Sequence, residues 1–210
     1  MARTVKKPQE RKADIVNAAR YLFQTKEYDK TTMQDVVNYL GIAKGTVYHY
    51  FASKEDLLEA VVHDIVDKSI EHMTRLLARS KRSVLGKMKL LMQAGNVAAE
   101  NEGILHELHR PGNETMHTRL LAAALVKQAP LYAELIKQGC DEGIFQTDTP
   151  LECAEFILSG VQFLTDVGIY PWTQEDLQRR VRAFPALIEQ QLKASPGSFQ
   201  FMVKLLRIRN

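Results

Sequence analysis

The chain has 210 residues, of which 45% are hydrophobic and 25% charged, as in an ordinary globular protein. It has no apolar run of the ~18 residues that a spanning helix needs, and its N-terminal MARTVKKPQERK has no apolar centre. We therefore expect neither a membrane span nor a signal peptide, and a cytoplasmic location.

The net charge of +3 is distributed unevenly along the chain. Residues 1–54 contain ten Lys/Arg and five Asp/Glu, whereas the remainder contains 18 basic and 20 acidic residues. A basic N-terminal part is the electrostatic footprint of a partner rich in phosphate. The basic arm before the first helix either contributes to this footprint or is a disordered terminus. The two cysteines, Cys140 and Cys153, fit free thiols and lie in no metal or redox motif.

Helix signals recur along the chain and strand signals are almost absent. The first expected helix covers about residues 10–25, after Pro8. Residues 31–58, TTMQDVVNYLGIAKGTVYHYFASKEDLL, then predict two short helices joined by a tight turn and a third helix with its own cap. Thr32 can cap the first of these, Gly41 suits its left-handed end, and Ser53 caps the third. This order predicts a helix-turn-helix, whose second helix enters a DNA major groove.

The second short helix, residues 44–50, is too polar for a core element. Only Val47 and the following Phe51 are expected to be buried. Gly45 would allow a close approach to a nucleic-acid backbone. The side chains that suit phosphates and base edges are Lys44, Thr46, Tyr48, His49 and Tyr50. The alternative is a solvated surface helix with aromatic spacers.

These residues resemble the DNA-binding domain of the TetR family of bacterial transcriptional repressors. The resemblance covers residues 11–60, and it is carried by GIAKGT at residues 41–46, YHYF at 48–51 and SKEDLL at 53–58. It implies that Lys54 contacts phosphate and that Thr32 assists at the DNA backbone. It further implies a homodimer on an inverted-repeat operator, controlled by a small molecule that shifts the helix after Ser53.

Beyond residue 58 the helical pattern continues with less specific signals. A long helix over residues 53–79 links the two parts, and another is expected over 83–100. Pro111-Gly112 ends a short helix, and Asn113 caps a helix to about Glu142. Thr149 and Glu152 suggest a capping box that opens a helix to about residue 168, and Thr173 caps the last large helix. We predict an all-α fold with a helix-turn-helix domain over residues 1–54 and a helical effector-binding and dimerisation domain over residues 55–210.

The last two large helices have broad apolar faces, which favour a four-helix bundle across a two-fold axis over an intramolecular core. Residues 196–210 are too apolar for a free tail, and docking on this bundle is preferred to exchange with a partner or binding to a membrane surface. Soft and aromatic residues on several helices suggest an apolar effector pocket. We assign to this pocket Met88, Met92, His109, Tyr132, Phe156, Phe163 and Trp172.

Histidines gather near residue 110, and His106 and His109 would share a helix face. The second histidine falls one residue too early for the His-Glu-x-x-His pattern, so we interpret the group as polar packing or ligand contact and predict no metal. No motif for catalysis or for a cofactor is present, so we predict no enzyme activity and no cofactor. The predicted function is a ligand-responsive DNA-binding repressor without membrane partners. The alternatives are an architectural DNA-binding protein without an effector, and a helical enzyme or carrier with a chance helix-turn-helix.

Overall fold

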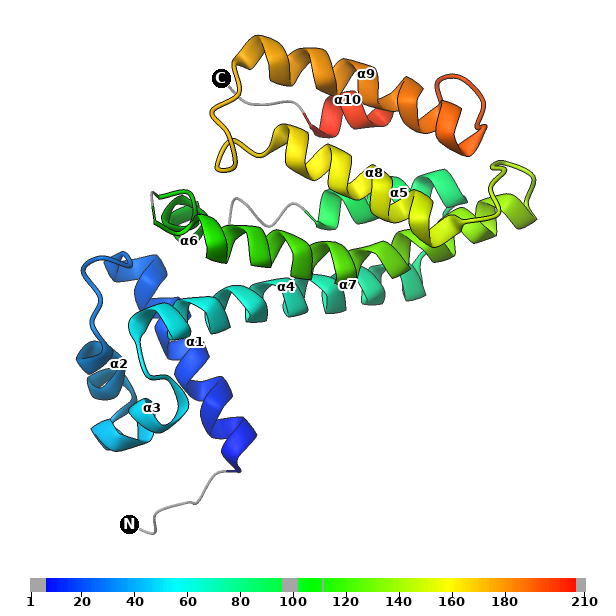
Figure 1. Ribbon diagram of the computed structural model, residues 1–210. Coiled ribbons are helices and arrows are strands. Elements are labelled where there is room, and N and C mark those ends of the chain that lie inside the picture. The colour runs from blue at the N-terminus through cyan, green and yellow to red at the C-terminus, as the bar shows by residue number, and fades with distance from the viewer. Residues whose placement is uncertain (1–6, 96–101, 111, 207–210) are drawn as a thin grey trace.

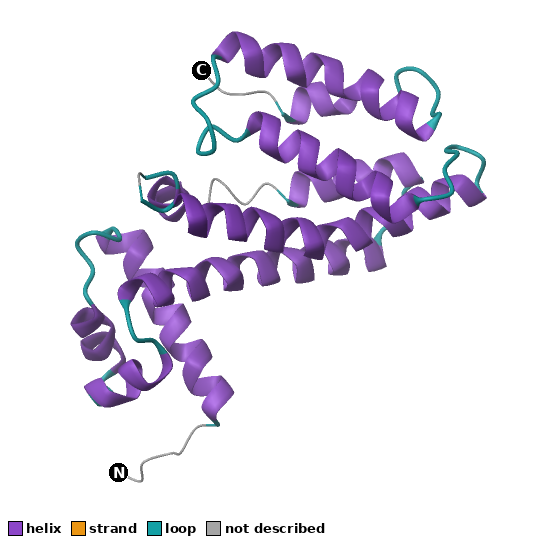
Figure 2. Cartoon of the chain, viewed as in Figure 1, coloured by secondary structure: helices purple, strands orange, loops and turns teal. Residues whose placement is uncertain are grey.

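The computed structural model describes residues 7–95, 102–110 and 112–206, and these form ten helices and no strand (Figures 1 and 2). The predicted all-α fold is confirmed. The helices in chain order are α1 (Pro8–Lys26), α2 (Met33–Leu40), α3 (Lys44–Tyr50), α4 (Lys54–Arg79), α5 (Val84–Ala94), α6 (Glu102–Leu108), α7 (Glu114–Asp141), α8 (Pro150–Thr165), α9 (Gln174–Leu192) and α10 (Phe201–Leu205).

The first three helices pack with the start of α4 around one apolar core, at one end of the molecule (Figure 1). Ile15 and Phe23 of α1, Val36 of α2, Val47 of α3 and Leu57 of α4 are each no more than 2% exposed. A helix of seven residues such as α3 is not stable alone, because helix nucleation is costly. Burial of Val47 in this shared core is therefore what holds α3 in place.

Local signals between α1 and α4 are formed as predicted. The Thr32 hydroxyl accepts a hydrogen bond from the amide of Asp35, whose carboxylate accepts one from the Thr32 amide. Gly41 ends α2 with φ 61° and ψ 33°, a left-handed conformation that suits glycine. Ser53 and Asp56 form a second capping box at the start of α4. Capping boxes thus precede and follow the turn that positions α3.

Helix α4 connects the two parts of the molecule. Its residues Leu57 to Ile65 belong to the first core, whereas Met73 belongs to a second core formed by α5 and α7–α10. Ile104 and Leu108 of α6 are 1% exposed and also pack in the first core. Helix α7 also contributes to both cores, with Leu120 in the first and Ile136 in the second, so the two cores meet along α4 and α7.

The second core is a bundle in which α8 lies against α7 and α9 (Figure 1). The described part of the C-terminal segment, residues 196–206, docks on the bundle as predicted: Phe199 and Met202 are buried, and α10 packs against α5 and α9, while residues 207–210 lie outside the described part. The Phe199 amide donates to Oε1 of the buried Glu189 at 2.9 Å. None of the helices that the structure describes combines the length and the apolar character needed to cross a membrane.

Several predicted helix ends are wrong in detail. Thr149 precedes Pro150 at the start of α8, but it makes no capping box, because its amide donates to the Thr147 hydroxyl at 3.1 Å. Helix α8 ends at Thr165 instead of near residue 168, and Asp166 turns the chain. Asn113 precedes α7 without capping it, since its side-chain amide donates to the Glu107 carbonyl oxygen at 2.8 Å. The predicted extension of α5 over residues 96–100 and Pro111 lie outside the described residues.

Candidate nucleic-acid interface and ligand cavity

One face of α3 points away from the rest of the protein. Lys44, Gly45, Tyr48 and His49 are exposed, and Tyr48 is 42% exposed despite its large ring. Thr46 and Tyr50 are half-buried. Together with the burial of Val47, this distribution separates one anchoring side from one polar side, as the sequence predicted.

Contacts between neighbouring side chains arrange this face. Lys44 Nζ lies 5.4 Å from the centre of the Tyr48 ring, and the rings of His49 and Tyr50 meet edge to face at 5.1 Å. The Lys44 ammonium group lies over the face of the Tyr48 ring, which accepts none of its N–H groups, so these donors remain available for a ligand. The face therefore presents one cation, two phenols and an imidazole within two helical turns.

Thr32 and Lys54 flank α3 and are held by other groups. The Thr32 hydroxyl is occupied by the capping box with Asp35, and Lys26 Nζ lies 2.8 Å from the same carboxylate. The hydrogen bond from Lys26, followed by those from Thr32, lowers the pKa of Asp35 to about 2. Lys54 Nζ donates to the Tyr28 carbonyl oxygen at 3.2 Å and lies 4.0 Å from the Tyr28 ring centre. Tyr28 was missed by sequence reasoning because it is 26 residues from Lys54.

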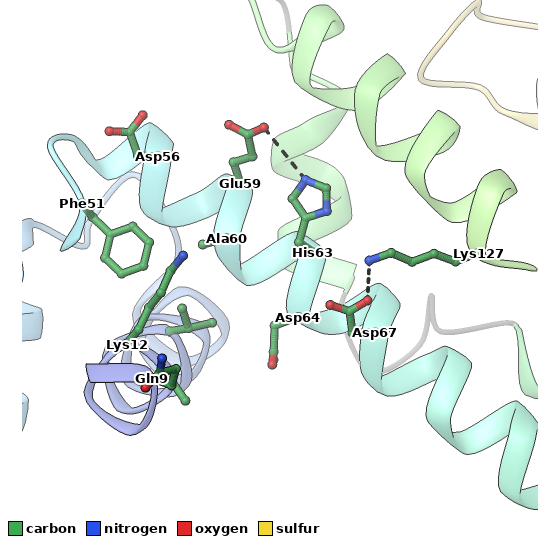
Figure 3. A pocket seen from close by; sticks show the side chains of 12 residues that line it. Gln9, Lys12, Phe51, Asp56, Glu59, Ala60, His63, Asp64, Asp67 and Lys127 are labelled. Carbon is green, nitrogen blue, oxygen red and sulfur yellow. Dashed lines mark hydrogen bonds and ion pairs between the residues drawn. The ribbon is translucent and has the colours of Figure 1, made fainter. Parts of the chain in front are cut away.

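An open groove of about 620 Å³ lies between α1 and α4, with Lys127 of α7 at one end (Figure 3). Lys127 pairs there with Asp67, and His63 Nε2 is 3.9 Å from Glu59 Oε1. The four carboxylates on its wall are Asp56, Glu59, Asp64 and Asp67. Their number makes this groove unsuited to a phosphate backbone, in contrast to the face of α3.

A second cavity lies inside the C-terminal bundle, between α5, α7, α8, α9 and α10, and three of the predicted effector residues line it: Met88, Met92 and Tyr132. Burial raises the pKa of the Tyr132 phenol, which is the only hydroxyl among the lining residues. The cavity volume is about 60 Å³. This is room for about two water molecules, whereas pockets for drug-sized ligands measure roughly 300–1,000 Å³.

The other predicted effector residues do not line this cavity. Phe156 and Phe163, on α8, are 72% and 52% exposed, because the cavity is lined by the opposite side of that helix. Trp172 lies in the α8–α9 connection, where its ring is 3.8 Å from the Arg180 guanidinium carbon and 4.5 Å from the Tyr170 ring. His109 belongs to a separate polar cluster.

That cluster joins His109, after α6, to His117 of α7 and Asp166 at the end of α8. His117 Nε2 is 3.1 Å from Asp166 Oδ2, and His109 Nε2 is 3.8 Å from Asp166 Oδ1. Burial alone would raise the pKa of Asp166, but the hydrogen bond and charge of His117 and the Gly168 amide outweigh it and lower this pKa. Burial lowers the pKa of His109. Sequence reasoning grouped His106 with His109, and it missed Asp166, which lies 49 residues after His117.

Two family models match this chain. One, described as "Bacterial regulatory proteins, tetR family", matches residues 15–61 and so covers the helix-turn-helix; the other, described as "Tetracyclin repressor-like, C-terminal domain", matches residues 96–187. The chain belongs to the TetR family. It is therefore a transcriptional regulator with a DNA-binding helix-turn-helix, and the resemblance noted in the sequence is confirmed.

Relatives and solved structures agree with this assignment. The chain is 29% identical over 159 residues to the HTH-type transcriptional regulator YfiR of Bacillus subtilis, covering 71% of this chain and 75% of the relative. It is 23% identical over 153 residues to the transcriptional repressor KstR2 of Mycolicibacterium smegmatis, covering 71% and 74%. The structure of RolR in complex with resorcinol is 14% identical with a TM-score of 0.61, covering 96% of this chain and 95% of that one. Both relatives are named as transcriptional regulators. The likeness to RolR, at 14% identity, concerns the fold alone.

Proposed function

We propose that this TetR-family regulator is a repressor that binds an inverted-repeat operator as a homodimer and is released by a small apolar or amphipathic effector. The observation that carries the proposal is the polar face of α3, which Val47 anchors between two capping boxes. A face of this kind, at the basic end of the chain, suits a DNA major groove.

Each side chain of this face has a distinct role in the proposal. Lys44 contacts a phosphate or a guanine, and the Thr46 hydroxyl contacts a phosphate. Tyr48 contacts a phosphate or a thymine methyl group, with His49 and Tyr50 beside it. The flanking contacts to the DNA backbone come from Thr32 and Lys54, while Gly45 permits a close approach.

The exposed apolar side of α8 and α9 supports the homodimer. Phe156, Phe163 and Val167 are each more than half exposed, as are Tyr170 in the connection and Leu187 on α9. Large apolar side chains that are exposed on two consecutive helices suit a protein–protein interface. In the proposed dimer these residues are buried against their counterparts, and the two α3 helices lie about 34 Å apart or a multiple of that distance.

The apolar cavity beside Met88, Met92 and Tyr132 supports a small effector. At about 60 Å³ the cavity is too small for a drug-sized molecule, so the effector must enlarge it. The neighbour RolR, which shares the fold, has been solved with resorcinol, a small aromatic molecule. An effector that favours the enlarged form by about 1–3 kcal/mol would weaken operator binding about 5- to 150-fold, and operator would weaken effector binding equally.

The first test selects duplexes from a random pool with the full-length protein and measures their affinity at several salt concentrations. We expect an inverted repeat, two chains per duplex, and a dimeric mass by light scattering. Lys54→Ala should weaken all duplexes alike and reduce the magnitude of the slope of log affinity against log salt by about one. The matched control is Lys137→Ala, an exposed lysine on α7 that should change neither quantity.

Enrichment of no duplex, or equal effects of the two lysine variants, would refute the DNA-binding surface. Specific binding of a duplex by one chain would refute the proposed dimer and leave the proposed DNA-binding surface in place. Equal ligand affinity with and without duplex, for every ligand that binds, would leave an architectural role as the remaining explanation.

A further inference from the structure

Three potential metal ligands meet where three elements of the fold come together. His109 follows α6, His117 lies in the first turn of α7, and Asp166 directly follows α8. Their candidate donor atoms all lie within 4.8 Å of one another. None of the three lines the apolar cavity or belongs to the face of α3.

The distances are close to those of an occupied site. Bonds of 2.0–2.1 Å in a tetrahedral arrangement place neighbouring donor atoms about 3.3 Å apart. His117 Nε2 and Asp166 Oδ2, at 3.1 Å, already match this separation. His109 Nε2 is 3.8 Å from the other carboxylate oxygen, Oδ1, and the three donor atoms lie within 4.8 Å of one another, so His109 must approach by on the order of 1 Å. Its side chain is 33% exposed, against 5% for His117, so it is the ligand with room to move.

The carboxylate and the outer imidazole are both positioned by the chain around them. Asp166 Oδ1 accepts hydrogen bonds from the amides of Gly168 at 2.8 Å and Ile169 at 3.2 Å, which fix its orientation. Such outer contacts orient the ligands of metal sites. A Cβ on Gly168 would lie 2.2 Å from His109 Cδ2, so the imidazole occupies the space that a side chain would take.

We propose that His109, His117 and Asp166 bind a divalent transition-metal ion of the zinc type, with a fourth coordination position open on the side of His109. Two imidazoles and one carboxylate suit zinc, cobalt or iron, whereas magnesium and calcium prefer oxygen ligands alone. An open fourth position is typical of zinc sites that accept a further ligand. His106, on the preceding helical turn, takes no part.

The site also lies on a path between the two cores. Arg110, the residue after His109, pairs with Asp29 in the α1–α2 connection and with Glu107 at 2.9 Å. Leu108, just before His109, packs in the first core. Metal binding that draws His109 towards Asp166 therefore acts on neighbouring residues that contact the helix-turn-helix part, Leu108 and Arg110. This consequence, a change in operator affinity, rests on the proposed function, whereas metal binding does not.

The test uses the untagged full-length protein freed of metal and titrated with Co²⁺, and with Zn²⁺ in competition with a chromophoric chelator. We expect one ion per chain and the visible spectrum of four-coordinate cobalt. Loss of an outer contact costs metal sites 10- to 100-fold in affinity, so loss of a direct ligand in His109→Gln or Asp166→Asn should cost about 100-fold or more. His106→Gln is the matched control and should bind Zn²⁺ like the parent.

His109→Gln is the decisive variant because its side chain is partly exposed, and circular dichroism checks that it is folded. Absence of stoichiometric binding, or an equal loss in His106→Gln, would overturn the site. With a selected duplex, Zn²⁺ should change the affinity of the parent and not that of His109→Gln. Metal binding without this change would remove the regulatory consequence, and metal binding in a protein that selects no duplex would refute the proposed function while the site stands.

Discussion

Replacing glycine by alanine should lower the stability of the protein at Gly41 and raise it at Gly45. At both positions an added Cβ would meet no protein atom within 4 Å, so packing does not distinguish them. Gly41 has φ 61° and ends α2, whereas Gly45 lies in the first turn of α3 with no such restriction. The backbone conformation alone therefore decides the sign of the effect on stability.

The magnitudes follow from the cost of each conformation. A left-handed residue with a Cβ costs about 1–2 kcal/mol, so Gly41→Ala should lower the melting temperature by about 2–8 °C for a chain of this size. Alanine in a helix is preferred to glycine by about 0.5–1 kcal/mol, so Gly45→Ala should raise it by about 1–4 °C. Thermal unfolding followed by circular dichroism measures both shifts.

DNA binding distinguishes Gly45 from a surface glycine that has no role in DNA contact. If α3 approaches the DNA backbone at Gly45, the added methyl group lengthens a charge-assisted contact worth about 1.5–3 kcal/mol and weakens binding about 10- to 150-fold. Gly45→Ala would then be more stable than the parent and bind DNA more weakly. A variant that is stabilised and binds the duplex as tightly as the parent would refute the close approach.

Three further outcomes are expected. Gly139→Ala should lower the unfolding free energy by about 1–3 kcal/mol in denaturant titrations, because its Cβ would lie 2.1 Å from Cδ2 of the buried Phe145; an unchanged midpoint would contradict this packing. Asp35 has a folded-state pKa of about 2, below the ordinary 3.8, so its stabilising contribution is present above both values and is lost as the pH falls between them. Urea titrations over this pH range should therefore show a smaller loss of unfolding free energy for Asp35→Asn than for the parent. Phe156→Glu should give a monomeric mass by light scattering with unchanged helicity, whereas Tyr39→Glu, at a residue 55% exposed on α2, should leave the mass of the parent.

The parts of the fold that were predictable depend on signals within a few residues. Thr32 and Ser53 each cap a helix through a residue three positions later, and Gly41 ends α2 through its own conformation. Such signals can be read directly from the sequence. Thr149 shows their limit, because the hydroxyl of Thr147 competes for the same amide and the capping box is not made.

Features that depend on distant residues were not predictable in the same way. Tyr28 beneath Lys54 and Asp166 beside His117 come from packing of separate helices, and no local pattern joins them. The aromatic residues of α8 illustrate a second limit. Apolar side chains occur all round this helix, so composition could not distinguish Phe156 on the surface from residues that line the cavity.

Because α4 is long, a small tilt of this helix moves its N-terminal end, next to α3, by several ångströms. Its 26 residues span about 39 Å. A tilt of about 5° about its C-terminal end, Arg79, would displace the other end by about 3 Å, close to the 3.4 Å that separates successive base pairs. In the proposed dimer, a change of this size in the direction of each α4 would alter the separation of the two α3 helices by an amount comparable to the step between neighbouring base pairs.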